Sequence, residues 1–94
     1  MLYAAKCYWP GVTQADLGQV AGRAAATGLV TGTGPVTYLG SLLFPADDLV
    51  LCLFHAPCTA AVIQASGQLA IPTERLMDTV WLPPHHCSPE GPRQ

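Results

Sequence analysis

The sequence predicts a single α+β domain whose strands and helices follow the order β-α-β-β-α-β. Its 94 residues fit one domain, because chains of this length rarely divide into two. Hydrophobic residues make up 50% of the chain and charged residues 11%, which excludes disorder over most of it. Along the chain, segments with the residue pattern of strands are followed by segments with the spacing of helices. The sequence of these segments predicts the order of the elements.

The first half provides one strand and one helix. Leu2–Trp9 is rich in apolar and aromatic residues and ends at a Pro-Gly pair, as strands often do. Thr13 suits an N-cap, with Asp16 in the capping-box position and Gly28 as the C-cap. Between them, apolar residues recur with the spacing of an amphipathic helix: Leu17, Val20, Ala21, Ala24 and Ala25.

The second half predicts two strands, a helix and a last strand. Val36–Phe44 and Leu49–His55 are joined by a hairpin-type turn at Pro45–Asp48. Pro57 suits the first turn of the second helix, whose apolar side holds Ala61, Val62, Ala65 and Leu69. Leu76–Leu82 is the last strand. Residues 1–83 therefore form the domain, and the proline-rich residues 84–94 are expected to be a flexible tail.

This order is that of the ferredoxin-like sandwich, a four-stranded antiparallel sheet with two helices on one face. We expect the strand order 4-1-3-2, with the first and third strands parallel. The face without helices should alternate to polar residues, yet both faces of Leu49–His55 are apolar. The sequence therefore predicts that two copies pack their sheets together, as in dimeric α/β barrels.

Composition excludes several classes of partner. With four Lys and Arg and a net charge of −2, the chain lacks the basic surface that binds nucleic acid. No apolar run is long enough to span a bilayer, and the N-terminus lacks the pattern of a signal peptide. We therefore expect a cytoplasmic protein with reduced cysteines.

The parallel arrangement of the first and third strands predicts a polar cluster in an apolar pocket. It places His55 beside Tyr8, and the fourth strand, which runs antiparallel to the first, brings Asp78 near Lys6. These four residues would form an acid/base set that needs no cofactor. The pocket is expected to hold an apolar ligand against Tyr38, Phe44, Leu51 and Leu53. The plain alternative is that these polar groups are solvated at strand ends.

Metal ligands are a separate possibility. Cys52 provides one thiol, and His85, His86 and Cys87 form a short run of donors in the tail. Adjacent donors on an extended chain need further ligands from elsewhere.

Three segments together resemble a family of small actinobacterial proteins that includes a nickel-binding protein: YWPGVT at Tyr8–Thr13, LCLFHAP at Leu51–Pro57 and AIPTER at Ala70–Arg75. The resemblance implies a ferredoxin-like fold and a homodimer, and it makes nickel the alternative to a protein without a cofactor. Family members often carry Ala-His-Gly late in the second helix, whereas this chain has Ser66 in place of the histidine.

Three functions remain open at this point. The first is a homodimeric pocket protein for a small apolar molecule, with isomerisation, cyclisation or oxygenation as its chemistry if it is an enzyme. The second is a protein that binds nickel or another divalent metal. The third is a module that covers its apolar sheet with a different protein.

Overall fold

A computed structural model describes residues 1–32 and 34–84 of the chain. Within them the elements are β1 (Leu2–Tyr8), α1 (Gln14–Thr27), β2 (Val30–Thr31), β3 (Gly34–Pro35), β4 (Thr37–Phe44), a 3₁₀ turn (Pro45–Asp47), β5 (Leu49–His55), α2 (Thr59–Gln68) and β6 (Thr73–Thr79). Of the predicted tail only Pro84 is described, so the flexibility of residues 84–94 stays a prediction.

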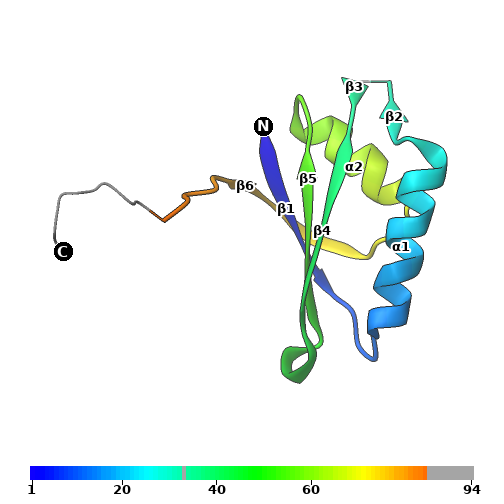
Figure 1. The fold of residues 1–94 in the computed structure, drawn as a ribbon, viewed down its shortest axis with the longest axis vertical. Coiled ribbons are helices and arrows are strands. Elements are labelled where there is room, and N and C mark those ends of the chain that lie inside the picture. Colours follow the sequence, from blue (N-terminus) through cyan, green and yellow to red (C-terminus); the bar gives the residue numbers. More distant parts are fainter. Residues whose placement is uncertain (33, 85–94) are drawn as a thin grey trace, which may run out of the picture.

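The predicted ferredoxin-like fold is confirmed. The order β4-β5-β1-β6 of the four-stranded sheet is the predicted order, and both helices in the described part of the chain cover the same face (Figure 1). The prediction that the first and third strands are parallel is wrong, because β5 runs antiparallel to β1. The α1 crossover makes β4 parallel to β1, and β5 returns from β4 through a tight turn, so β5 must oppose both.

Local signals in the sequence fix the ends of α1. The Thr13 backbone N–H donates to Asp16 Oδ2 at 2.9 Å, and the Asp16 N–H donates to Thr13 Oγ1 at 3.2 Å, which completes the capping box. At the other end Gly28 has φ +68°, and its N–H donates to the carbonyl of Ala24 at 3.1 Å. The predicted caps are therefore confirmed.

Other predicted boundaries move. Helix α2 begins at Thr59 after the N-cap Cys58, so Pro57 precedes its first turn. The last strand ends at Thr79, three residues before the predicted Leu82. A short β2–β3 ribbon, which the sequence analysis treated as part of a connection, forms between α1 and β4.

The core lies between the sheet and the helices. Cross-strand partners share a face of a sheet, and the register pairs Tyr3 with Phe54, Ala5 with Cys52 and Cys7 with Val50. All six side chains are at most 2% exposed. The helices contribute the other fully buried residues of this layer, Val20, Ala61, Val62 and Ala65.

Gly34 meets a backbone requirement at the β3 ribbon. Its φ is +131°, and a Cβ added there would lie 2.8 Å from Pro57 Cγ. Such a conformation and such a contact both exclude ordinary side chains.

We therefore expect Gly34→Ala to destabilise the fold by about 1–3 kcal/mol. Gly18→Ala is the matched control, because Gly18 lies within α1 and nothing is within 4 Å of its added Cβ. The control should stabilise the helix by up to about 1 kcal/mol. Urea unfolding followed by circular dichroism measures both, and equal midpoints for the two variants would contradict this role of Gly34.

Candidate functional site: an uncovered sheet face and a groove beside it

The sheet face opposite the helices, called the free face below, is largely apolar. The register assigns to it Leu2, Ala4, Lys6 and Tyr8 of β1, Thr37, Gly40, Leu42 and Phe44 of β4, Leu49, Leu51, Leu53 and His55 of β5, and Arg75, Met77 and Thr79 of β6. Leu42 is 51% exposed and Phe44 39%, and the three β5 leucines are half-buried. Apolar surface of this extent usually marks an interaction or ligand site.

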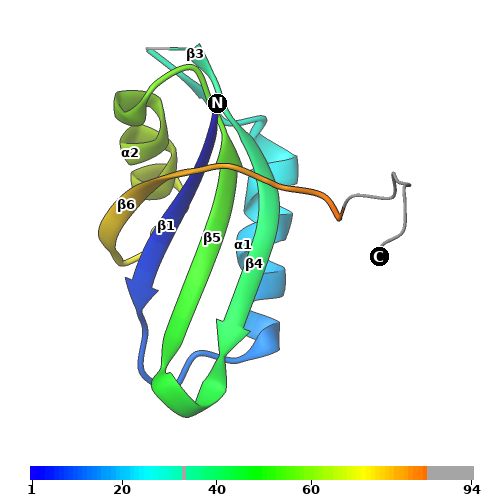
Figure 2. The same ribbon diagram turned by 90° about the vertical axis from the view of Figure 1, so that its left-hand side faces the viewer.

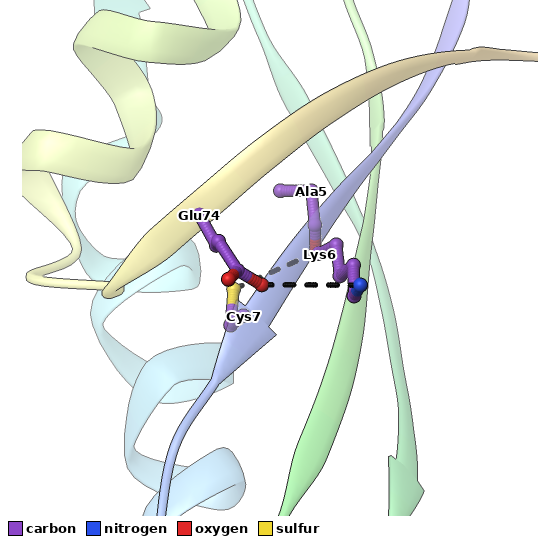
Figure 3. A network of polar contacts seen from close by, with 4 residues as sticks. All are labelled: Ala5, Lys6, Cys7 and Glu74. Atoms are coloured by element: carbon purple, nitrogen blue, oxygen red, sulfur yellow. Dashed lines mark hydrogen bonds and ion pairs between the residues drawn. The ribbon is translucent and has the colours of Figure 1, made fainter.

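Few charges interrupt the free face. Lys6 Nζ lies 3.9 Å from Glu74 Oε1, and Figure 3 shows the lysine side chain and this contact beside the β1–β6 junction. The register between these strands shifts after Lys6, and this irregularity brings Glu74 toward the lysine. Both side chains are well exposed, at 41% and 59%, so the pair contributes little to stability.

The predicted acid/base cluster does not form. Because β5 is antiparallel to β1, His55 lies opposite Leu2, and Tyr8 lies opposite Leu49 at the far end of the same strands. Six residues of strand separate the two ends, about 20 Å. Asp78 pairs with Tyr3, which places it on the helix side of the sheet, away from Lys6. The expected convergence of these four residues is therefore wrong.

His55 has a different setting from the one predicted. It lines a cleft of about 310 Å³ with Met1, Thr37 and Pro57. The N-terminal ammonium group closes this end of the sheet by donating to the carbonyl of Ala56 at 2.8 Å.

Three of the four predicted ligand-contacting residues, Phe44, Leu51 and Leu53, lie on the free face. Tyr38 lies on the other side, where its ring packs 5.6 Å from that of Phe54 at an angle of 50°. The register shifts between Tyr38 and Gly40, and one extra residue at a bulge reverses the alternation of side chains. Gly40 accommodates the bulge with φ +131°.

A groove runs between α1 and β4 at the edge of the sheet. This α1/β4 groove has a volume of about 520 Å³ and is lined by Ala21, Ala24, Ala25, Gly28 and Leu29 on the helix side and by Val36 to Gly40 on the strand side. None of these lining residues carries a charge. Tyr38 forms one wall, and burial is the main cause that raises the pKa of its phenol.

Behind Tyr38 lies a polar chain that sequence reasoning missed. The Tyr38 hydroxyl is hydrogen-bonded to that of Ser41, and Ser41 Oγ donates to Cys52 Sγ at 3.3 Å. Cys7 lies on the same face of the neighbouring strand, two register positions from Cys52. Its thiol contacts the carbonyl of Ala5 at 3.5 Å (Figure 3). The signal in the sequence was the placement of both cysteines on core-facing positions of adjacent strands.

The two buried thiols shift each other's pKa in opposite directions. The Cys7 thiol donates to the Cys52 thiolate, and this bond, followed by that from Ser41, lowers the pKa of Cys52 to about 7 against the burial that opposes it. The same bond to Cys52, together with burial, raises the pKa of Cys7. Hydrogen bonds to the charged form favour that form, so Cys52 is the thiol that ionises first.

The metal hypothesis gains no ligand set from the residues described. Among them no three His, Cys, Asp or Glu side chains converge on a point, and Cys52 has Cys7 as its neighbouring thiol. A nickel site with nitrogen and oxygen ligands needs more donors than this pair. His85, His86 and Cys87 lie outside the described residues. Within the described part of the chain, neither helix has the length and apolar character of a membrane span.

Comparisons with known proteins show the fold. The chain matches no protein-family model and no curated protein. Among solved structures it is similar to SCO4226 from Streptomyces coelicolor A3(2), with a TM-score of 0.72 and 15% identity over 88% of this chain and 100% of that one. At this identity the likeness shows a shared ferredoxin-like architecture with a small actinobacterial protein.

Removing the hydroxyl of Ser41 tests the polar chain. In Ser41→Ala the Cys52 thiolate loses a donor, so we expect the pKa of Cys52 to rise from about 7 toward that of a free thiol. Thiolate absorbance titrated against pH measures the shift, with Cys58 and Cys87 replaced by serine to remove their signals. Ser66→Ala is the control, since Ser66 Oγ donates to the carbonyl of Val62 and contacts neither thiol. Superimposable curves for Ser41→Ala and its parent would contradict the assignment.

Proposed function

We propose that this protein is a homodimer that packs the free faces of two copies together and binds a small, largely apolar organic molecule between them. The observation that carries the proposal is the free face itself. Its β5 row of Leu49, Leu51 and Leu53 is left half-buried by residues 1–32 and 34–84, while Val50, Cys52 and Phe54 on the opposite side are fully buried. Sheets with one solvated face normally alternate to polar residues there.

A second copy is the simplest cover for such a surface. Two apolar sheet faces pack about 10 Å apart with their side chains interdigitated, and a two-fold axis lets one patch cover itself. The free face carries few charges: Lys6 and Arg75 are cross-strand partners, and Lys6, which lies opposite Leu51, forms an ion pair with Glu74.

The space for a ligand follows from small side chains in one row across the sheet. Gly40, Leu53, Ala4 and Met77 are neighbours in that order, so two small residues alternate with two large ones. Two such rows facing each other leave room that an apolar molecule would fill. Lys6 and Tyr8 at one end of the face, and His55 at the other, supply hydrogen-bonding groups for polar ends of that molecule.

A charge on the free face should break the dimer. Leu53→Asp places an unpaired carboxylate at the interface twice, once from each copy, because its cross-strand partners Ala4 and Gly40 carry no charge, and each carboxylate costs several kcal/mol to bury. We expect its dissociation constant to rise by at least about a hundredfold. Ile63→Asp is the matched control, because Ile63 is 62% exposed on α2, away from the free face.

Size-exclusion chromatography with light scattering measures the two variants and the parent chain. The proposal requires a dimer for the parent and for Ile63→Asp and a monomer for Leu53→Asp. A parent chain that remains monomeric at high concentration would refute it and would favour a different protein as the cover.

A larger side chain in the central row of the free face should occupy the space between the two sheets and exclude a ligand from it. The neutral dye Nile red is expected to bind saturably to the parent dimer with a rise in fluorescence. Leu53→Trp adds bulk in the central row and should weaken that binding by about tenfold or more, while the dimer persists. Ile63→Trp, on the exposed surface of α2, is the control. Dye binding that Leu53→Trp leaves unchanged would contradict a ligand site between the sheets.

A further inference from the structure

Two cationic side chains of the free face lie side by side. Lys6 of β1 and Arg75 of β6 are cross-strand partners, and such partners project from the same face. Figure 2 looks onto this face and shows β1 and β6 as neighbours. The chain after β6 crosses in front of β5 and β4 from Thr79, which pairs with Leu2 at the other end of β1. Lys6 is 41% exposed and Arg75 is exposed, so the pair is open to solvent.

The free face has the opposite sign of charge from the whole chain. The chain has six Asp and Glu residues against four Lys and Arg residues, with a net charge of −2. The free face carries Lys6 and Arg75, and among the described residues the register assigns no Asp or Glu to it. An apolar surface whose charges are all positive favours a ligand that carries a negative charge.

Glu74 balances only one of the two cations. Its carboxylate lies 3.9 Å from Lys6 Nζ, whereas Arg75 forms no ion pair with the residues that the structure describes. Like charges on directly opposite residues repel each other. Packing two free faces together would also take both cations out of water, which is costly without a counter-charge. One further negative charge in each copy would balance the site.

The cation pair borders the space between the two sheets. Two neighbouring rows cross the same four strands, namely Leu42, Leu51, Lys6 and Arg75, and Gly40, Leu53, Ala4 and Met77. Ala4 and Lys6 are two residues apart on one strand, about 7 Å. Because Ala4 is short, the lysine ammonium can reach the space above it while its stem covers apolar surface.

We propose that the molecule bound between the sheets is an apolar carboxylic acid in its anionic form, with its carboxylate between Lys6 and Arg75 and its apolar chain over Ala4 and Gly40. This inference rests on the homodimer and the ligand site proposed above, and it names the chemical class of that ligand.

A carboxylate suits this pair of cations better than a phosphate does. Arginine presents a planar fork that matches the two oxygens of a carboxylate, and lysine adds a compact charge beside it. A carboxylate supplies the single negative charge that the pair lacks once Glu74 is counted. A phosphate group carries up to two negative charges near neutral pH, and the excess would repel Glu74.

Two fluorescent probes test the carboxylate directly. Dansyl-labelled undecanoic acid and its neutral methyl ester share one apolar chain and differ in the charge at its end. We expect the parent dimer to bind the acid at least about tenfold more tightly than the ester, with dansyl emission reporting both. Lys6→Met and Arg75→Met each remove one charge and keep an extended side chain. Each should weaken acid binding about tenfold and leave ester binding within about twofold.

Two further variants separate charge from packing. Lys6→Arg keeps the cation and should keep the preference for the acid. Glu74→Gln removes the carboxylate that competes for Lys6 and should tighten acid binding by up to about fivefold, with ester binding unchanged. The titrations are run at protein concentrations at which light scattering shows a dimer for every variant.

The outcomes separate this inference from the proposed function. Equal affinities for acid and ester, or an acid affinity that neither Lys6→Met nor Arg75→Met lowers, overturn the carboxylate assignment and leave the ligand site standing. A parent dimer that binds Nile red but neither dansyl probe also overturns the assignment alone. A parent dimer that binds none of the three dyes, or a parent chain that forms no dimer, overturns the ligand site as well.

A second measurement uses ligands without a fluorescent label. Decanoate should raise the midpoint of thermal unfolding of the parent dimer, because a ligand that binds only the folded state stabilises it. Decanol at the same concentration should raise the midpoint less. In the double variant Lys6→Met/Arg75→Met this difference should disappear. Equal shifts from decanoate and decanol in the parent would contradict the carboxylate assignment.

Discussion

The sheet has apolar side chains on both faces, but the two helices of the described residues cover only one face. The rest of the structure depends on this difference between the two faces. The covered face explains the fold, because Tyr3, Ala5, Cys7, Val50, Cys52 and Phe54 form a dry layer under the helices. The uncovered face explains the proposed assembly, since water against leucines is the unfavourable state that association removes. Both follow from the same strand, β5, in which the six residues from Leu49 to Phe54 are apolar on both faces.

Element order and caps were accessible from the sequence because they rest on local rules. The capping box at Thr13 and the glycine C-cap at Gly28 were predicted from neighbours within a few residues, and the structure contains both. The direction of β5 relative to β1 is also a matter of topology, and the parallel assignment overlooked the reversal at the turn after β4. That one error misplaced His55 by the length of a strand.

The remaining differences come from features that alternation alone does not reveal. A bulge after Tyr38 moves that side chain to the helix side, where it joins Ser41 and Cys52. Single-sequence patterns give little sign of a bulge, although Gly40 is the residue type that permits one. The proximity of Cys7 to Cys52 joins two strands that are far apart in the sequence, so no local pattern reveals it. The end of β6 was misplaced for a related reason, since Val80–Leu82 continues the apolar pattern of β6 without being part of the sheet.

Sedimentation equilibrium of the full chain over a wide range of concentrations tests the central claim most directly. The chain mass is 9.9 kDa, and the account predicts a solution mass of twice this value at micromolar concentration, with dissociation on dilution. A mass that stays at that of one chain throughout would show that the leucine-rich face is stable against water, and would contradict the account.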